Sequence, residues 1–165
     1  MKLQEFERVY EELSPKVFNV AYRMTGSLED AQDVLQDVFM KVWKHHKGFR
    51  GEAKLSTWIY RIAVNTAISL IRKRKPTKPI EDFEYMPADT KPFDPRIIKI
   101  EKAIQRLPEG EKKVFVLHDV EGFTHEEIGE ILDISQGTSK SQLHKARKKL
   151  QEMLKGKVHV GQLES

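Results

Sequence analysis

The sequence predicts an all-α protein made of two small helical domains joined by a linker. Through most of the chain, apolar residues recur every three or four positions, which is the spacing of one buried helix face. The pattern stops between residues 76 and 95, where five of the seven prolines lie among acidic residues. Proline removes backbone donors and disfavours helix at the preceding residue, so we expect a linker there. The expected domains are residues 1–75 and 96–157, followed by a frayed tail at 158–165.

The composition indicates a soluble protein that binds a polyanion. Hydrophobic residues make up 39% of the chain and charged residues 33%, which allows a core and a hydrated surface. The net charge is +4, and its positive excess lies in the two predicted domains, on either side of the acidic linker. Two basic zones favour two separate contacts with a partner such as nucleic acid.

Membrane insertion is not expected from this sequence. No apolar run approaches the roughly 20 residues of a membrane span, and the first residues lack the apolar segment of a secretory signal. The chain has no cysteine, which excludes disulfides and thiolate metal sites. We therefore expect a cytoplasmic protein.

In the first domain, the pattern predicts four helices. A short amphipathic helix precedes the Ser-Pro pair at residues 14 and 15, which is typical of a cap and the first turn of a second helix. Gly26 ends that helix in the manner of a left-handed stop, and Ser27 caps a third helix that reaches about residue 47.

The third helix has two distinct faces. Its apolar stripe is expected to be core and consists of Ala31, Val34, Leu35, Val38, Phe39, Val42 and Trp43. Its outer face, which we call the docking face, consists of Asp33, Gln36, Asp37, Met40 and Lys41. An exposed methionine beside carboxylates is typical of a surface that binds another protein.

The fourth helix, over residues 55–75, has an apolar face that is expected to pack and a polar face opposite it. The polar face carries Thr57, Arg61, Asn65, Ser69 and Arg72, with Tyr60 at its margin and a run of cations after it. Such side chains can hydrogen-bond, stack or neutralise phosphates, which suits a nucleic-acid strand. The alternative is a solvated helix whose terminal cations complement its own dipole.

The sequence of the second domain predicts a helix-turn-helix motif. Two helices, over residues 96–107 and 109–121, precede a capping box between Thr124 and Glu127 that opens a short helix. A tight turn follows, and Ser135 caps a long basic helix. The N-terminal half of that helix would enter the major groove of DNA. The alternative is a helical hairpin with a solvated basic end.

The candidate DNA contacts of the last helix form what we call the recognition face. The residues that could reach base edges are Gln136, Thr138, Ser139, Lys140, Ser141 and His144. The residues placed for flanking phosphates are Arg147 and Lys148.

No pattern in the chain predicts catalysis. There is no Gly-rich phosphate loop, no GxSxG motif and no cluster of carboxylates or histidines with the spacing of metal ligands. A tyrosine-dependent DNA strand transferase could use Tyr60 or Tyr85, but the chain is short for that chemistry. We expect no enzyme activity, no metal and no cofactor.

Long motifs in both halves carry a resemblance to a known family. The first half contains DAQDVLQDVFMKVWKH and GFRGEAKLSTWIYRIAVNTAISLIRKRK, and the second contains LPEGEKKVFVLHDVEGFTHEEIGEILDISQGTSKSQLHKARKKL. These motifs resemble the bacterial RNA polymerase sigma factors of the extracytoplasmic-function type, within the sigma-70 family. The resemblance covers nearly the whole chain in the family's order.

The resemblance implies a sigma region 2 at residues 1–75 and a sigma region 4 at residues 96–157. By this analogy the docking face binds the clamp helices of the largest core polymerase subunit, and the flap of the second-largest subunit is a further partner. The minus-ten element of promoter DNA would be held partly single-stranded, with a base flipped out. The residues implied in that contact, which we call the minus-ten face, are Phe49, Arg50, Lys54, Ser56, Thr57, Tyr60, Arg61, Asn65, Arg72 and Lys73. The recognition face would read the minus-thirty-five element as duplex.

The resemblance also implies regulation by an anti-sigma factor, which is often membrane-anchored. The sequence departs from the common pattern in two places. Trp58 is followed by Ile59, whereas housekeeping sigma factors carry a tryptophan pair. In the last helix, Ser139 and Gln142 stand where family members often have valine and arginine. Two rivals stay open at this point: a stand-alone helix-turn-helix regulator that binds duplex DNA unaided, and a helical adaptor that binds only protein.

Overall fold

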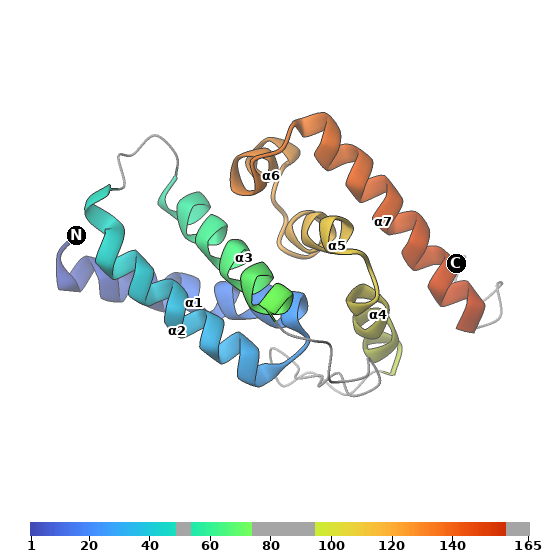
Figure 1. Cartoon of the computed structure of the whole chain (residues 1–165), viewed down its shortest axis with the longest axis horizontal. Helices are drawn as coiled ribbons and strands as arrows, with labels where there is room; N and C mark the ends of the chain where they lie inside the picture. Colours follow the sequence, from blue (N-terminus) through green and yellow to red (C-terminus); the bar gives the residue numbers. More distant parts are fainter. Residues whose placement is uncertain (49–53, 74–94, 158–165) are drawn as a thin grey trace.

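The computed structural model describes residues 1–48, 54–73 and 95–157, and these residues form helices and no strands (Figure 1). The all-α prediction is confirmed. The first domain contains α1 (Leu3–Thr25), α2 (Leu28–His45), the short 3-10 helix η1 (His46–Gly48) and α3 (Leu55–Lys73). The second domain contains α4 (Pro95–Gln105), α5 (Glu109–Phe115), the π-helical η3 (Val116–Val120), α6 (His125–Leu132) and α7 (Gln136–Lys157). The predicted linker and tail lie outside the described residues, apart from Pro95.

The prediction of a helix break at residues 14 and 15 is wrong, because α1 continues through Pro15 to Thr25. A proline inside a helix costs about 3 kcal/mol through the lost hydrogen bond and the ring clash. Burial on both sides of it outweighs this cost, since Leu13, Val17 and Val20 are buried in one core and each contributes about 1.5–3 kcal/mol. Within its described residues, 1–48 and 54–73, the first domain therefore has three α-helices where four were predicted.

The helix ends around residue 26 are as predicted. Gly26 adopts a left-handed φ of 74° and its amide donates to the carbonyl of Tyr22, which ends α1. The hydroxyl of Ser27 accepts a hydrogen bond from the amide of Asp30 at 3.3 Å and so caps α2. These two residues turn the chain sharply and set α2 against α1.

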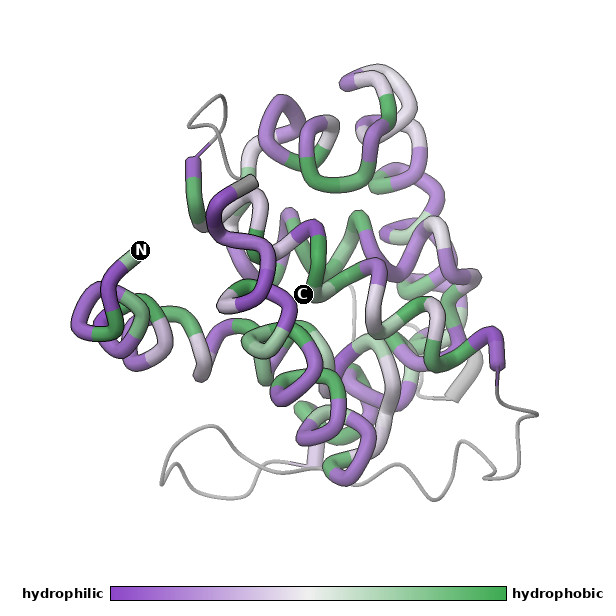
Figure 2. Tube along the Cα trace, turned by 60° about the vertical axis from the view of Figure 1, so that its left-hand side comes forward, coloured by the Kyte–Doolittle hydropathy of each residue, from purple (hydrophilic) through white to green (hydrophobic). Residues whose placement is uncertain are grey.

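The core of the first domain lies where α1, α2 and α3 meet. The predicted apolar stripe of α2 is buried or half-buried except at its end, where Trp43 is 43% exposed. The indole packs edge-on against Phe6, with ring centroids 5.1 Å apart. Trp43 thus covers the rim of the core and does not enter it. Figure 2 shows the alternation of hydrophobic and hydrophilic residues along the helices that produces these packed faces.

The second domain is assembled on α7, which packs against α4, α5 and α6. Leu143, Ala146 and Leu150 of α7 are buried, together with Ile128 and Ile131 of α6. The predicted helix over residues 109–121 begins as α5 and finishes as η3 before Gly122, whose φ is 81°.

The two domains also pack against each other. The contacts join α3 to α6, and α1 to α4 and η3. In Figure 1, α3 therefore lies between the other helices of its own domain and the second domain. Among the helices of the described residues, none combines the length and hydrophobicity that a membrane crossing requires.

Candidate nucleic-acid interface

The helix-turn-helix is built from α6, a tight turn and α7, as predicted. Thr124 and Glu127 form the expected capping box, in which each side chain accepts a hydrogen bond of 3.1 Å from the other's backbone amide. At the other end of α6, Asp133 adopts a left-handed φ of 56°. The Ser135 hydroxyl then accepts a hydrogen bond of 3.0 Å from the amide of Thr138 and caps α7.

Gly129 permits the close approach of the turn to α6. Its carbonyl accepts a hydrogen bond of 3.1 Å from the amide of Ile134. A Cβ atom at residue 129 would lie only 2.7 Å from the carbonyl oxygen of Ile134. Only glycine fits this position without a shift of the backbone.

Most of the recognition face is exposed on one side of α7. The exposed members are Gln136, Thr138, Lys140, Ser141, His144, Arg147 and Lys148. The cap at Ser135 stabilises the first turn of α7, and this N-terminal end is where base contacts are expected.

The expectation that Ser139 faces DNA is wrong, because its side chain is fully buried. Ser139 shares a helical face with Leu143, Ala146 and Leu150, and that whole face packs inward. Its hydroxyl lies 2.7 Å from Nδ1 of His125 and thereby joins α7 to the first turn of α6. The spacing of these four residues was the sequence signal that could have revealed this role.

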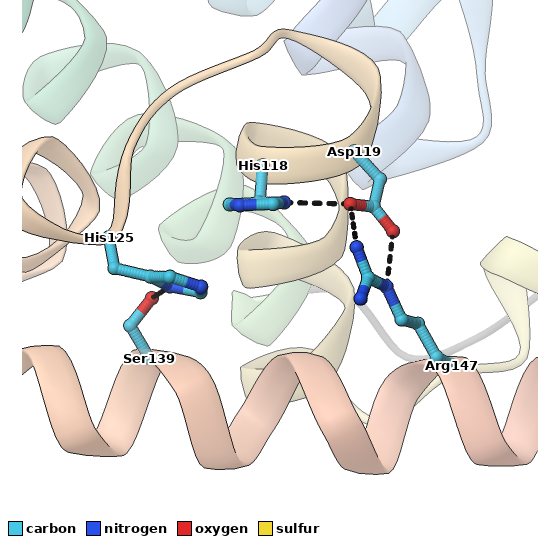
Figure 3. Close-up of polar contacts among 5 residues, drawn as sticks. All are labelled: His118, Asp119, His125, Ser139 and Arg147. Carbon is cyan, nitrogen blue, oxygen red and sulfur yellow. Dashed lines mark hydrogen bonds and ion pairs between the residues drawn. The ribbon is translucent and has the colours of Figure 1, made fainter.

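Arg147 is exposed but already has an anionic partner (Figure 3). Its Nη2 and Nε atoms donate to the two carboxylate oxygens of Asp119, at 2.7 and 2.9 Å. The hydrogen bond from Arg147 is the main cause of a lowered pKa of the Asp119 carboxyl, and the same bond raises the pKa of Arg147. Such a bidentate pair fixes the guanidinium beside the flank of the recognition face. No motif in the sequence singled out Asp119.

His118 and His125 lie next to the ion pair of Asp119 and Arg147. Nδ1 of His118 lies 2.7 Å from a carboxylate oxygen of Asp119, and the His118 ring stacks on His125 with centroids 4.5 Å apart (Figure 3). Partial burial, followed by the neighbouring charge of His118, lowers the pKa of the His125 imidazole. The lowered pKa favours the neutral form of the ring in this contact between α6 and α7.

The minus-ten face is only partly accessible. Lys54, Asn65 and Lys73 are exposed and Ser56 is half-buried, whereas Phe49 and Arg50 lie outside the described residues. The expectation that Thr57 and Tyr60 are exposed is wrong, since they are 2% and 3% exposed.

The second domain covers Tyr60. The phenol ring meets Phe123 edge-on, with centroids 4.8 Å apart and an interplanar angle of 76°. Burial, and then the carboxylate of Glu121, raises the pKa of the Tyr60 hydroxyl. Periodicity within one helix placed Tyr60 at the edge of a polar face, but it carries no information about a second domain above that face.

Two arginines of the minus-ten face also bind the second domain. The guanidinium of Arg61 donates to the backbone carbonyl of Glu130 in α6. The guanidinium of Arg72 donates to both carboxylate oxygens of Glu109, at 2.6 and 3.3 Å. Both guanidinium groups predicted to contact DNA therefore bind oxygen atoms of the second domain, while both side chains stay on the exposed surface.

The docking face lies on the outer side of α2. Asp33, Gln36, Asp37 and Met40 are exposed, and the Met40 side chain is 71% exposed. Lys41 is half-buried and its ammonium lies 3.1 Å from a carboxylate oxygen of Asp37. Across the part of the chain that the structure describes, no group of histidine, aspartate and glutamate side chains is arranged to hold a metal ion.

Comparison with known proteins identifies both domains. The family model of sigma-70 region 2 matches residues 9–77, and that of sigma-70 region 4 matches residues 97–150. The ECF RNA polymerase sigma factor SigW of Bacillus subtilis is 31% identical over 156 residues, covering 85% of this chain and 83% of that protein. The ECF RNA polymerase sigma factor SigM of Mycobacterium tuberculosis is 30% identical over 151 residues, covering 90% and 76%.

Solved structures give the same result. The sigma factor RpoE of Bartonella quintana, in complex with the anti-sigma factor NepR, matches with a TM-score of 0.78 and 26% identity over 93% of this chain and 98% of that one. CnrH, in complex with the cytosolic domain of CnrY, has the same fold, with a TM-score of 0.76 and 20% identity over 95% of this chain and 92% of that one.

The matched regions define a sigma-70-type transcription initiation factor. The chain belongs to the extracytoplasmic-function RNA polymerase sigma factors. As such it directs promoter-dependent transcription initiation and is not an enzyme, which confirms the function predicted from the sequence.

Proposed function

We propose that this sigma factor binds core RNA polymerase through the docking face of α2 and reads two promoter elements through α3 and α7. The observation that carries the proposal is the separation of these faces on different helices, each with exposed polar side chains of the required kind. A sigma factor needs a protein-binding face and two DNA contacts, because the polymerase supplies the chemistry.

At the minus-thirty-five element, α7 would enter the major groove by its capped end. Gln136, Lys140 and His144 lie on its exposed side and carry donors or acceptors that suit base edges. Lys148, one turn beyond His144, is placed for a phosphate. Ser139 acts here by positioning α7 on His125, and not by touching a base.

At the minus-ten element, α3 would hold a single strand. Asn65 can hydrogen-bond to a base edge, while Lys54 and Lys73 can neutralise phosphates. Arg61 and Arg72 would join them once released from Glu130 and Glu109. A flipped base then requires a pocket on this domain, and the neighbouring loop over residues 49–53 lies outside the described residues.

For the protein partners, we assign Asp33, Gln36, Asp37, Met40 and Lys41 to the clamp helices of the largest polymerase subunit. The second domain would bind the flap of the second-largest subunit. Because the similar RpoE binds the anti-sigma factor NepR, we also propose that an anti-sigma factor holds this chain in the cytoplasm, in some settings at the membrane.

Transcription with purified core polymerase tests the proposal. Core polymerase is incubated with promoter DNA from the source genome, with and without this protein. Specific transcripts are expected only when the protein is present, and Asp37→Arg should abolish them. A protein that bound duplex DNA equally well without polymerase, and added no transcripts, would instead be a stand-alone helix-turn-helix regulator.

A further inference from the structure

We propose that Asp119 is a positioning residue for promoter binding, which holds the guanidinium of Arg147 so that its open edge meets a DNA phosphate at the minus-thirty-five element. The inference rests on the function proposed above for α7. Asp119 comes from η3 and Arg147 from the flank of the recognition face (Figure 3). A carboxylate beside a DNA-binding helix repels phosphates, so any benefit of Asp119 must come through Arg147.

The contact with Asp119 uses one edge of the Arg147 guanidinium and leaves the other edge open. Nη2 donates to Oδ1 of Asp119 at 2.7 Å, and Nε donates to Oδ2 at 2.9 Å. A guanidinium has five N–H groups in a planar fork, so this contact uses two of them and leaves three, on Nη1 and on the outer side of Nη2. The Arg147 side chain is 55% exposed. Its open edge therefore keeps the parallel N–H groups that bind two oxygens of a phosphate.

The carboxylate of Asp119 is itself held in place by His118. Nδ1 of His118 lies 2.7 Å from Oδ1 of Asp119, the oxygen that also accepts from Nη2 of Arg147. Since an ionised carboxylate only accepts hydrogen bonds, Nδ1 of His118 carries the proton in this contact. The His118 ring stacks on His125, whose Nδ1 lies 2.7 Å from the hydroxyl of Ser139 on α7. Asp119 is therefore fixed from two sides, by His118 and by Arg147.

The π-helical turn η3 anchors the backbone that carries Asp119. The amide of Glu121 donates to the carbonyl of Val116 at 3.0 Å, and this five-residue span defines the π-helical turn. Val116 and Leu117 are fully buried, whereas Asp119 lies at the surface beside α7. Turns of this kind are rare and occur frequently at functional sites. Here the turn joins a rigid core anchor to a carboxylate that faces Arg147.

A second ion pair of α7 differs from this one in its burial. Nζ of Lys149 lies 2.8 Å from Oε1 of Glu111 in α5, and the Glu111 side chain is only 7% exposed. The Asp119 side chain is 22% exposed and its partner Arg147 is largely in solvent. Exposed ion pairs contribute little to stability, so a change at Asp119 can be tested for its effect on DNA binding without loss of the fold.

Ordering Arg147 in advance favours DNA binding. A free arginine side chain loses rotamer freedom when it contacts a phosphate, whereas the side chain of Arg147 is already held. Arg147 lies about one turn beyond His144, the last residue proposed for base edges, and so on the part of α7 that would pass the DNA backbone. The negative charge of Asp119 acts in the opposite direction. Because the two effects differ in sign, the direction of the change in affinity distinguishes them.

Three variants of the full chain test the inference. Asp119→Asn keeps the shape of the side chain but removes its charge and one of the two acceptors. Asp133→Asn is the matched control, because it makes the same change at an exposed aspartate of the same motif. Arg147→Lys keeps the positive charge but removes the planar fork. Fluorescence anisotropy measures the binding of each variant to a short duplex of random sequence at several salt concentrations, since phosphate contacts dominate such binding.

Asp119→Asn should bind the duplex about two- to tenfold more weakly than the wild type, although it makes the protein more positive, because Arg147 must then be ordered during binding. The slope of log affinity against log salt should fall by up to about 0.9, the contribution of one phosphate contact. Arg147→Lys should be weakened to a similar extent, and Asp133→Asn should bind at least as tightly as the wild type. In an Arg147→Ala background, Asp119→Asn should cause no further weakening.

If Asp119→Asn binds the duplex as tightly as the wild type, or more tightly, the inference is overturned, because Asp119 then only repels DNA. Equal weakening with and without Arg147 would overturn it too, since Asp119 would then act on the fold of α7. A thermal melt verifies each variant; should Asp119→Asn not fold, wild-type affinity of Arg147→Lys would overturn the inference. The proposed function fails separately, if core polymerase gains no promoter-dependent transcripts from the wild type, because binding to the random duplex does not involve polymerase.

Discussion

Gly129 offers a demanding test of the helix-turn-helix, because two opposing effects of Gly129→Ala can be weighed. Alanine favours an α-helix by about 1 kcal/mol over glycine. Its Cβ would lie 2.7 Å from the carbonyl oxygen of Ile134, and that oxygen belongs to the backbone. Overpacking that moves backbone costs about 1–3 kcal/mol. The same shift would also strain the hydrogen bond from the Ile134 amide to the Gly129 carbonyl. The clash should outweigh the gain in helix preference, with a net loss of stability of up to about 2 kcal/mol.

Gly137→Ala is the matched control in the same motif. A Cβ at residue 137 would meet only the Ser135 hydroxyl oxygen, at 3.9 Å. The substitution should therefore leave stability unchanged or raise it by up to about 1 kcal/mol. Urea unfolding followed by circular dichroism measures both variants. The reasoning about close approach is refuted if Gly129→Ala is as stable as Gly137→Ala.

Three further substitutions have defined outcomes. Asp37→Arg should weaken capture of core polymerase while leaving the melting temperature nearly unchanged, since its exposed pair with Lys41 contributes at most about 1 kcal/mol; unchanged capture would remove Asp37 from the docking face. His125→Gln should flatten the loss of stability in mild acid, measured by urea unfolding at a series of pH values. The wild type should lose stability as the pH falls below 6.5, the ordinary pKa of imidazole. This follows because the pKa of His125 is lowered in the folded protein, so that the unfolded chain takes the proton first. An equally steep loss of stability in the variant would exclude His125 as its source. Lys148→Ala should lower the slope of log affinity against log salt for duplex DNA by about 0.9, and an unchanged slope would show that Lys148 does not neutralise a phosphate.

Local patterns predicted the helices and their ends well. The stop at Gly26, the cap at Ser27, the capping box at Thr124 and the cap at Ser135 all appear in the structure. Each depends on residues a few positions apart, so the sequence contains the whole cause. Pro15 shows the limit, because the helix through it is maintained by a core that α2 and α3 supply.

Side chains at the borders of faces were harder to place. Ser139 is polar but lies on the packed face of α7, where His125 satisfies its hydroxyl. Tyr60 is buried by Phe123, more than sixty positions away in the sequence. The partners of Arg61, Arg72 and Arg147 are likewise distant in sequence, and helical periodicity does not predict which distant residues meet.

The most direct test of the proposal that α3 and α7 recognise two promoter elements is to map transcript starts. The template is fragmented genomic DNA from the source organism, transcribed by core polymerase with and without the protein. Added starts should share two sequence blocks, near minus-ten and minus-thirty-five, at a fixed separation. Asn65→Ala should relax only the block nearer the start, and Gln136→Ala only the block further upstream. The proposed assignment of α3 and α7 is contradicted if no starts are added, or if either substitution alters the other block.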